Sequence, residues 1–140
     1  MRIDTNKIMD GQRAGDIVWI CHYHRPDMEK KALRNVPPTK VIVRDNSVLP
    51  KNKTVYYSKS HFSPLSKKGE PTAKVISPVD NTGYRSRCGS MLYVFDNEIE
   101  CVAEWNKQLL NHIKVVDGLI AGAAKRWQDE KSSLCQMFGA

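Results

Sequence analysis

The hydrophobic and polar positions of the chain follow two periods, and the change between them lies near residue 96. Before that point, short runs rich in β-branched and aromatic residues, several of them alternating with polar residues, are separated by turn-forming sequences. These runs predict five strands, at 16–24, 39–45, 54–58, 72–77 and 91–95. The polar segments between them predict loops, of which the longest are 25–38, 60–71 and 78–90.

After residue 96 the pattern predicts a long helix. Asn97 followed by Glu100 matches a capping box, and apolar residues then recur at spacings of three and four, which places them on one helical face. Unbroken to Lys131, the helix would span about 50 Å at 1.5 Å per residue. The alternative is a hairpin that folds back at Asp117-Gly118. The stripe consists of Val102, Trp105, Leu109, Ile113, Val116, Ile120, Ala123 and Trp127.

We therefore expect one α+β domain over 1–140, which is an ordinary domain length. Residues 16–95 would form an antiparallel β-sheet or a small SH3-like barrel of about five strands, and 97–131 a C-terminal long helix or helical hairpin. Such a sheet is too small to cover the whole helix, so a second chain is expected to cover the remainder, most simply in a two-fold dimer. The alternative is a hairpin packed on its own sheet. The residues expected at the oligomer interface are Trp105, Leu109, Ile113, Val116, Ile120 and Trp127.

Composition argues against a membrane or secreted protein. No apolar run reaches the roughly 18 residues that a spanning helix needs, and residues 1–15 lack a signal-peptide pattern. Four cysteines lie far apart in sequence, whereas a secreted disulfide scaffold has them densely spaced. We expect a cytoplasmic protein with reduced, mostly buried thiols at Cys21, Cys88, Cys101 and Cys135.

The formal net charge of +7 is unevenly distributed. Residues 1–95 carry 17 Lys and Arg against 8 Asp and Glu, whereas residues 96–140 carry 5 against 7. A basic field of this kind attracts nucleic acids, nucleotides or acidic protein surfaces. The expected partner is therefore anionic, and it binds to the first two-thirds of the chain.

Signatures of catalysis are absent from the sequence. The four residues Cys21-His22-Tyr23-His24 offer possible ligands, but with His61 and Cys88 they match no zinc template. There is no nucleophile-elbow motif and no glycine-rich phosphate loop, because Gly69 and Gly83 stand alone. We expect a protein that is not an enzyme and that needs neither a metal nor a cofactor.

An anion-binding cluster is the most specific chemistry in the sequence. The segment 81–87, Asn-Thr-Gly-Tyr-Arg-Ser-Arg, places an aromatic ring and two guanidinium groups beside a glycine turn. Arginine binds phosphate through two hydrogen bonds at once, and a tyrosine ring stacks on a base. The predicted ligand-binding residues are Tyr84, Arg85 and Arg87, with Asn106, Lys125 and Arg126 of the helix closing the pocket.

Two further basic clusters are candidates for the same partner, or are ordinary surface charge. The first consists of Lys30, Lys31 and Arg34 in the first long loop. The second places aromatic residues among lysines and consists of Lys51, Lys53, Lys59, Lys67 and Lys68 with Tyr56, Tyr57 and Phe62.

Two resemblances add expectations. The run Gly15-Asp16-Ile17-Val18-Trp19-Ile20 resembles the first strand of SH3-like and KOW-type barrels, which bind RNA, DNA or protein. The segment 78–113 is similar in layout to bacteriophage anti-Thoeris proteins, small anti-defence proteins that sequester cyclic ADP-ribose signals. It joins a D-N-T-G-Y-R-S loop, a strand ending Tyr93-Val94-Phe95-Asp96, and a helix containing Glu100-Cys101 and Trp105-Asn106. Those proteins trap their ligand at subunit interfaces without cleaving it; none of their binding residues transfers to this chain.

Two functions follow from these observations. The first is a phage protein, working in the cytoplasm of an infected bacterium, that sequesters an anionic cyclic nucleotide or ADP-ribose-type immune signal. The alternative is an SH3/KOW-like nucleic-acid-binding module that modulates host transcription or protects DNA. The first predicts a compact pocket, and the second predicts a continuous basic face whose binding weakens steeply with salt.

Overall fold

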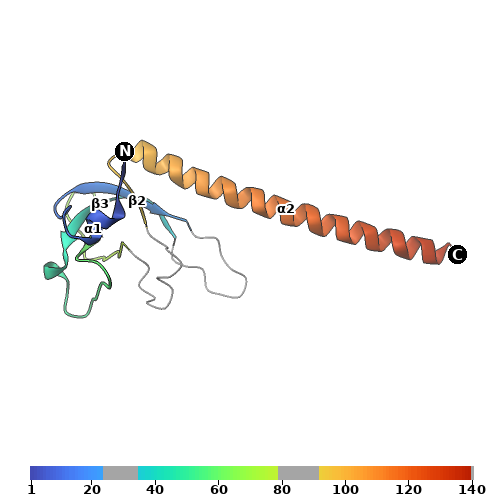
Figure 1. The fold of residues 1–140 in the computed structure, drawn as a ribbon, viewed down its shortest axis with the longest axis horizontal. Helices are drawn as coiled ribbons and strands as arrows, with labels where there is room; N and C mark the ends of the chain where they lie inside the picture. Colours follow the sequence, from blue (N-terminus) through green and yellow to red (C-terminus); the bar gives the residue numbers. More distant parts are fainter. Residues whose placement is uncertain (24–34, 79–91, 140) are drawn as a thin grey trace. The chain divides into compact units, whose positions relative to one another are not determined.

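A computed structural model of the chain describes residues 1–23, 35–78 and 92–139. The chain forms two compact units, Met1–Asn106 and Lys107–Ala140. The first contains a five-stranded antiparallel sheet and the beginning of a long helix, and the second contains the rest of that helix (Figure 1). This confirms the predicted α+β class. The elements are β1 (Arg2–Ile3), α1 (Thr5–Met9), β2 (Ile17–His22), β3 (Val36–Asp45), the 3-10 turn η1 (Asn46–Val48), β4 (Ser60–Pro64), β5 (Tyr93–Phe95) and α2 (Glu98–Phe138).

The sheet has the strand order β1-β5-β2-β3-β4, and every neighbouring pair is antiparallel. Alternate residues of its central strands point to opposite faces, as the two-residue period of a strand requires. On one face, Val18 and Ile20 of β2 pack in the main core, which consists of Ile3, Ile8, Val18, Ile20, Val41, Val43, Phe62, Leu92 and Val94.

The opposite face of β2 and β5 packs against the first turns of α2. Cys21 and Phe95 are buried there with Cys101 of the helix, and Trp19, Tyr93 and Trp105 surround them. Trp105 meets Tyr23 edge to face, with ring centroids 5.7 Å apart. Both faces of β2 and β5 are therefore covered, which explains why their sequences are rich in β-branched and aromatic residues.

Prolines 37 and 38 were expected to close a loop, but they lie within β3. Ile20 pairs with Thr39 and His22 pairs with Val36, so two residues of β3 oppose one residue of β2. This is a β-bulge, and a bulge tolerates proline because its extra residue needs no ladder hydrogen bond. The strand predicted at 39–45 therefore begins three residues earlier than expected.

Two of the predicted strands are wrong, and the sheet contains two strands that were not predicted. The segment 54–58 is not a strand, and 72–77 contributes only an isolated bridge in which Ile76 pairs with Phe62. The strand β4 lies where a loop was expected, and β1 with α1 precedes residue 16. Polar residues concealed β4, because Ser60, His61 and Ser63 are buried and two of them are hydrogen-bonded through their side chains.

The long helix is continuous over Glu98–Phe138, so the alternative hairpin at Asp117-Gly118 is wrong. Asn97 caps its start as predicted, because the Glu100 N–H donates to Asn97 Oδ1 at 2.9 Å. The reciprocal bond to Glu100 Oε1, at 3.1 Å, comes from the Asn97 side-chain Nδ2 rather than from the backbone N–H of a capping box. Glycine costs only about 1 kcal/mol in a helix interior, so Gly118 does not interrupt the element. Among the described helices, none combines the length and apolar character needed to cross a bilayer.

Candidate functional site

The predicted ligand-binding residues divide into two groups. Tyr84, Arg85 and Arg87 lie outside the described residues, as does the basic cluster Lys30, Lys31 and Arg34. Asn106, Lys125 and Arg126 are exposed on α2, but Asn106 belongs to the first compact unit and the two cations belong to the second. The sequence-predicted pocket thus has three described members, and no contact among them defines a site.

A different surface, on the sheet unit, has the stronger combination of charge and aromatic exposure. From residue 46 to residue 69 the chain carries five lysines and no Asp or Glu. These are Lys51, Lys53, Lys59, Lys67 and Lys68, all exposed. An uninterrupted positive segment of this kind favours contact with the phosphates of an anionic chain.

Two tyrosines project from this segment in what we call the tyrosine loop, residues 49–59. The side chains of Tyr56 and Tyr57 are neighbours, with ring centroids 6.4 Å apart and ring planes tilted by 48°. Tyr56 is 53 % exposed and Tyr57 is 70 % exposed. Tyr57 also has a φ angle of 63°, in the left-handed region that bulky residues rarely adopt. Backbone strain of this kind, costing of order 1–3 kcal/mol, is found most often at functional positions.

The tyrosine loop is held at its base although its tip is exposed. The Asn46 N–H donates to the Lys59 carbonyl at 3.0 Å, and Asn46 Nδ2 donates to the Ser58 carbonyl at 2.6 Å. The Lys59 N–H donates to the Met9 carbonyl at 2.8 Å, which ties the loop to α1. Val55 is buried beneath the loop. A loop with closed ends and its own buried side chain presents its outer residues in a defined geometry.

His61 completes the base of the loop. Its Nδ1 lies 3.1 Å from Asn46 Oδ1. Because the Asn46 amide donates to Ser58, its oxygen must be the acceptor here, so the geometry assigns the proton to His61 Nδ1. Burial lowers the pKa of His61 by disfavouring the charged ring, and repulsion from Arg44 lowers it further, against an opposing effect of Asp45.

The depressed pKa of His61 predicts a pH dependence of stability. The unfolded chain binds a proton at an ordinary histidine pKa of about 6.5, whereas the folded chain binds it only at lower pH. Stability is therefore complete above pH 6.5 and falls as the pH drops toward the folded pKa. Urea unfolding at pH 7.5 and 5.5 should show a lower free energy of unfolding at the lower pH. In His61→Asn the difference between the two pH values should be smaller, and the new amide keeps a hydrogen-bond donor near Asn46. His112→Gln on α2 is the matched control and should keep the full loss of stability between pH 7.5 and 5.5. If His61→Asn also keeps that full loss, His61 is not its cause.

The cysteines form a structural cluster. Cys21 and Cys101 are buried free thiols, with Cys21 Sγ 3.6 Å from the Cys101 carbonyl oxygen, whereas Cys135 is exposed on α2. Hydrogen bonding to Cys101 and burial both raise the pKa of Cys21, which disfavours the reactive thiolate. The expectation of mostly buried thiols is confirmed for Cys21 and Cys101 and is wrong for Cys135. Cys88 lies outside the described residues.

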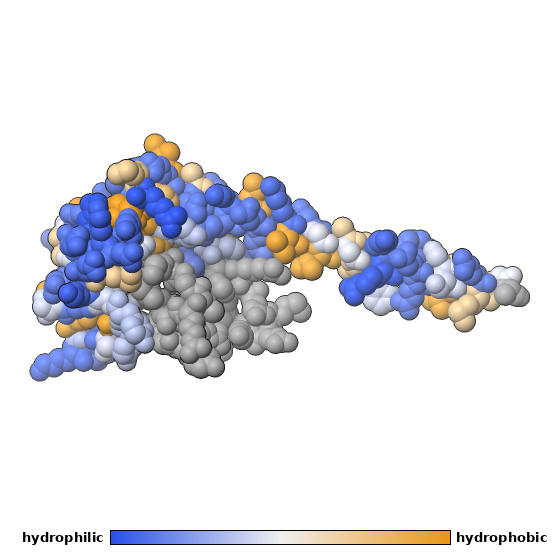
Figure 2. All heavy atoms as spheres, in the orientation of Figure 1, coloured by the Kyte–Doolittle hydropathy of each residue, from blue (hydrophilic) through white to orange (hydrophobic). Residues whose placement is uncertain are grey.

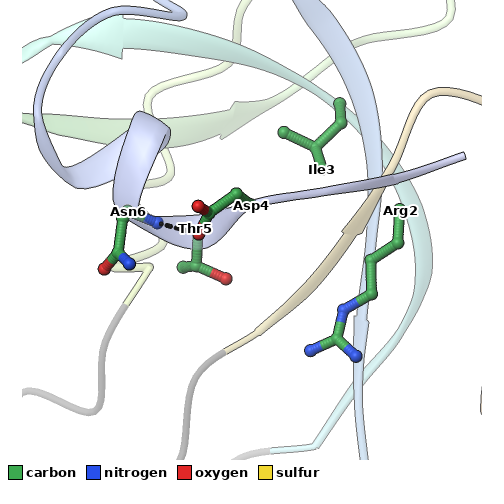
Figure 3. A pocket seen from close by; sticks show the side chains of 5 residues that line it. All are labelled: Arg2, Ile3, Asp4, Thr5 and Asn6. Carbon is green, nitrogen blue, oxygen red and sulfur yellow. Dashed lines mark hydrogen bonds between the residues drawn. The ribbon is translucent and has the colours of Figure 1, made fainter.

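A shallow pocket beside the N-terminal segment offers little chemistry. Figure 3 shows its lining, Arg2–Asn6. Asp4 caps α1 by accepting the Asn6 N–H at 3.0 Å, and the Arg2 guanidinium lies 4.5 Å from the centre of the Tyr93 ring. Both charged groups are thus engaged in local structure. Within 1–23, 35–78 and 92–139, no three His, Cys, Asp or Glu side chains are grouped as metal ligands.

In the sequence, Tyr56 and Tyr57 belong to one of two secondary basic clusters. Phe62 was assigned to the same cluster, and that assignment is wrong because Phe62 is fully buried in the core. The period of the run Thr-Val-Tyr-Tyr-Ser predicted a strand, which would have turned one of the two tyrosines inward. The segment is not a strand, both tyrosines are exposed, and Tyr57 has a positive φ angle that the local sequence pattern does not signal.

Comparison of the chain with protein-family models, with functionally characterised proteins and with solved structures finds no match. The resemblances to SH3-like barrels and to phage anti-defence proteins therefore stay predictions, and the surfaces described above are the basis for any functional proposal.

Proposed function

We propose that the protein binds single-stranded nucleic acid through the tyrosine loop. The observation that carries this proposal is the exposed pair Tyr56 and Tyr57 within a lysine-rich segment that has no carboxylates. Every base presents an aromatic face, and stacking on tyrosine is worth about 1–3 kcal/mol per base. Stacking on a side chain requires an unpaired base, so the loop favours a single strand over a duplex.

The lysines give the proposed interface its affinity for the backbone. Lys51 and Lys53 precede the tyrosines and Lys59 follows them, so phosphates of a bound strand have cations on both sides of the stacked bases. Each neutralised phosphate of a single strand contributes about −0.7 to the slope of log K against log salt concentration. Three to five lysine contacts therefore predict a slope of about −2 to −3.5.

Fluorescence anisotropy with a labelled oligothymidylate and a duplex of the same length tests this proposal between 50 and 200 mM salt. We expect tighter binding of the single strand and the slope given above. Lys51→Gln with Lys53→Gln should make the slope less negative by about 1.4. Lys107→Gln with Lys114→Gln, two exposed lysines of α2, is the matched control and should leave the slope unchanged.

Sequestration of an anionic nucleotide signal is the competing hypothesis. It depends on Tyr84, Arg85 and Arg87, outside the described residues, so its support comes from the sequence. A panel of cyclic nucleotides and ADP-ribose isomers, screened by thermal melting, separates the two. A clear rise of the melting temperature with one small nucleotide, together with no oligonucleotide binding, would replace nucleic-acid binding by sequestration. A phage origin, a cytoplasmic location and the absence of catalysis stay predictions under either function.

We also propose that α2 joins copies of this chain. Large apolar side chains are exposed along the helix, among them Ile113, Ile120 and Trp127, and Figure 2 shows hydrophobic patches on its surface. Exposed apolar patches of this kind mark an interaction site. Helices in water gain most of their stability from packing an apolar face, which a second copy would provide. Of the predicted interface residues, Trp105 packs against the cluster of Cys21, Phe95 and Cys101 instead.

A further inference from the structure

Seven of the eight stripe positions identified from sequence, all except Trp105, lie in a heptad repeat that continues beyond them toward both ends of α2. From Ile99 to Met137, seam residues alternate at spacings of three and four without interruption. A seven-residue repeat sustained over five heptads favours a supercoil with another helix, because the seam keeps facing the same partner. The a positions are Ile99, Asn106, Ile113, Ile120, Trp127 and Leu134, and the d positions are Val102, Leu109, Val116, Ala123, Glu130 and Met137.

This seam is exposed in the single chain. Of its ten apolar residues, seven are between 38 and 82 % exposed: Ile99, Ile113, Val116, Ile120, Trp127, Leu134 and Met137. Leu110 and Leu119, at the flanking e and g positions, are also exposed. The other α-helix in the described part of the chain, α1, has five residues and is too short to cover the seam. Within the described residues no second long helix of this chain lies along the seam, and a second copy of the chain carries the same heptad period.

The two polar seam residues reveal how two copies fit together. Asn106 and Glu130 are equally distant from Gly118, which is also the midpoint of Glu98–Phe138. A two-fold axis through Gly118, perpendicular to an antiparallel pair of helices, brings Asn106 of each copy opposite Glu130 of the other. The face is therefore complementary to itself, as a closed two-fold interface requires.

The same arrangement matches side-chain sizes in the apolar layers. Around the axis, Val116 faces the partner's Ile120, and Ile113 faces the partner's Ala123. Leu109 faces the partner's Trp127, so the largest side chain of the seam meets a smaller one. Alternation of large and small residues across facing positions is how a core fills without voids or overpacking.

A parallel, in-register pair is much less favourable. It places Glu130 against the partner's Glu130 in the seam, where two carboxylates lose water and repel each other. It also places Arg126 at g beside the partner's Lys131 at e, which is a like-charge contact. The antiparallel pair avoids both, and its one new like-charge contact, between the two Asp117 side chains at the axis, lies at the solvent-exposed edge, where charges interact weakly.

We propose that two copies associate through α2 as an antiparallel coiled coil centred on Gly118, with Asn106 of each copy hydrogen-bonded to the partner's Glu130. The proposal rests on the self-association proposed above and adds its orientation and register. It is independent of the tyrosine loop and of any bound nucleic acid.

Light scattering combined with size-exclusion chromatography tests association. The full chain should have twice its monomer mass of 15.9 kDa. Ile120→Glu places a charge in a layer beside the axis and should weaken the dimer at least 100-fold. Ala121→Glu adds the same charge one residue later, on the outer face, and should leave the dimer intact. A monomeric full chain, or equal dimer dissociation constants for Ile120→Glu and Ala121→Glu, overturns the proposed self-association through this face.

A distance measurement on the dimer tests orientation and register separately. Spin labels on the exposed Cys135 of the Cys88→Ser variant leave the buried Cys21 and Cys101 unlabelled. In the proposed dimer Cys135 lies opposite the partner's Cys101, so the two labels are separated by about 50 Å along the helix axis at 1.5 Å per residue. A shift of one heptad changes this separation by about 10 Å. A separation near 50 Å supports the proposal, whereas a short one shows a parallel dimer and overturns it.

Asn106→Lys provides a check that needs no label. In the antiparallel dimer each new lysine faces the partner's Glu130, so the dimer dissociation constant should not rise. In a parallel dimer the two lysines would face each other, and the dissociation constant would rise at least tenfold, which would contradict the orientation.

Discussion

Replacing both Tyr56 and Tyr57 with alanine is expected to weaken binding of a single-stranded oligonucleotide at least 30-fold. Each stacked base is worth about 1–3 kcal/mol, so losing two stacking platforms costs about 2 kcal/mol or more. Both side chains are largely exposed, so the double variant should fold with a stability close to that of the parent. Anisotropy titration at fixed salt measures the affinity, and thermal melting verifies the fold.

The strained backbone at Tyr57 provides a sharper variant. Tyr57→Gly removes the ring but suits a φ angle of 63°, because glycine adopts left-handed conformations without steric cost. We expect weaker binding together with a stability that does not fall. Asn52→Ala, also exposed on the tyrosine loop, is the matched control and should leave the affinity unchanged. Full affinity in the double alanine variant would rule out stacking on this loop.

Phe62→Ala is expected to have the largest effect on stability. Phe62 is fully buried, pairs with Val43 across β3 and β4, and exchanges two backbone hydrogen bonds of 2.9 Å with Ile76. Truncating a buried phenylalanine to alanine typically costs about 3–5 kcal/mol through lost burial and the cavity that remains. That is a large part of the 5–15 kcal/mol stability of a typical domain. Urea unfolding monitored by circular dichroism measures the loss.

Tyr56→Ala is the appropriate comparison for Phe62→Ala, because the sequence places both aromatic residues in one basic cluster. It removes an aromatic ring from the same region but from the exposed side, and should change stability by less than about 0.5 kcal/mol. Similar losses in the two variants would mean that the division into core and surface aromatics described here is incorrect.

The prediction of elements from sequence succeeded where one face or stripe of an element is buried. The strands β2 and β3 and the helix α2 carry clear two-residue or three-and-four-residue periods, and both strands and the start of α2 were located within three residues, whereas α2 extends seven residues beyond its predicted end at Lys131. The strand β4 was missed because its buried residues Ser60 and His61 are polar and depend on distant partners, the Ile8 carbonyl and the Asn46 amide. Hydrogen-bond partners that lie far away in the chain leave no local signal.

The candidate site shows the same division. The lysines and tyrosines of residues 49–59 are visible in the sequence, as is the absence of carboxylates around them. Their arrangement in space cannot be seen in the sequence, because the sequence favours a strand that would bury one tyrosine. The loop conformation depends on Asn46 bridging Ser58 and His61 and on the bond from Lys59 to Met9, contacts that form only when the sheet and α1 assemble.

The amino-acid sequence by itself determined the α+β class, the capped helix that begins after Asn97 and the basic character of the first 95 residues. Those properties follow from local periodicity, local hydrogen bonding and charge counting, which need no knowledge of distant contacts. Only the tertiary structure decided that Phe62 is in the core while Tyr56 and Tyr57 are exposed, that β1 joins the sheet edge, and that α2 is unbroken at Gly118. Those outcomes depend on which distant groups satisfy each buried polar atom and cover each apolar side chain.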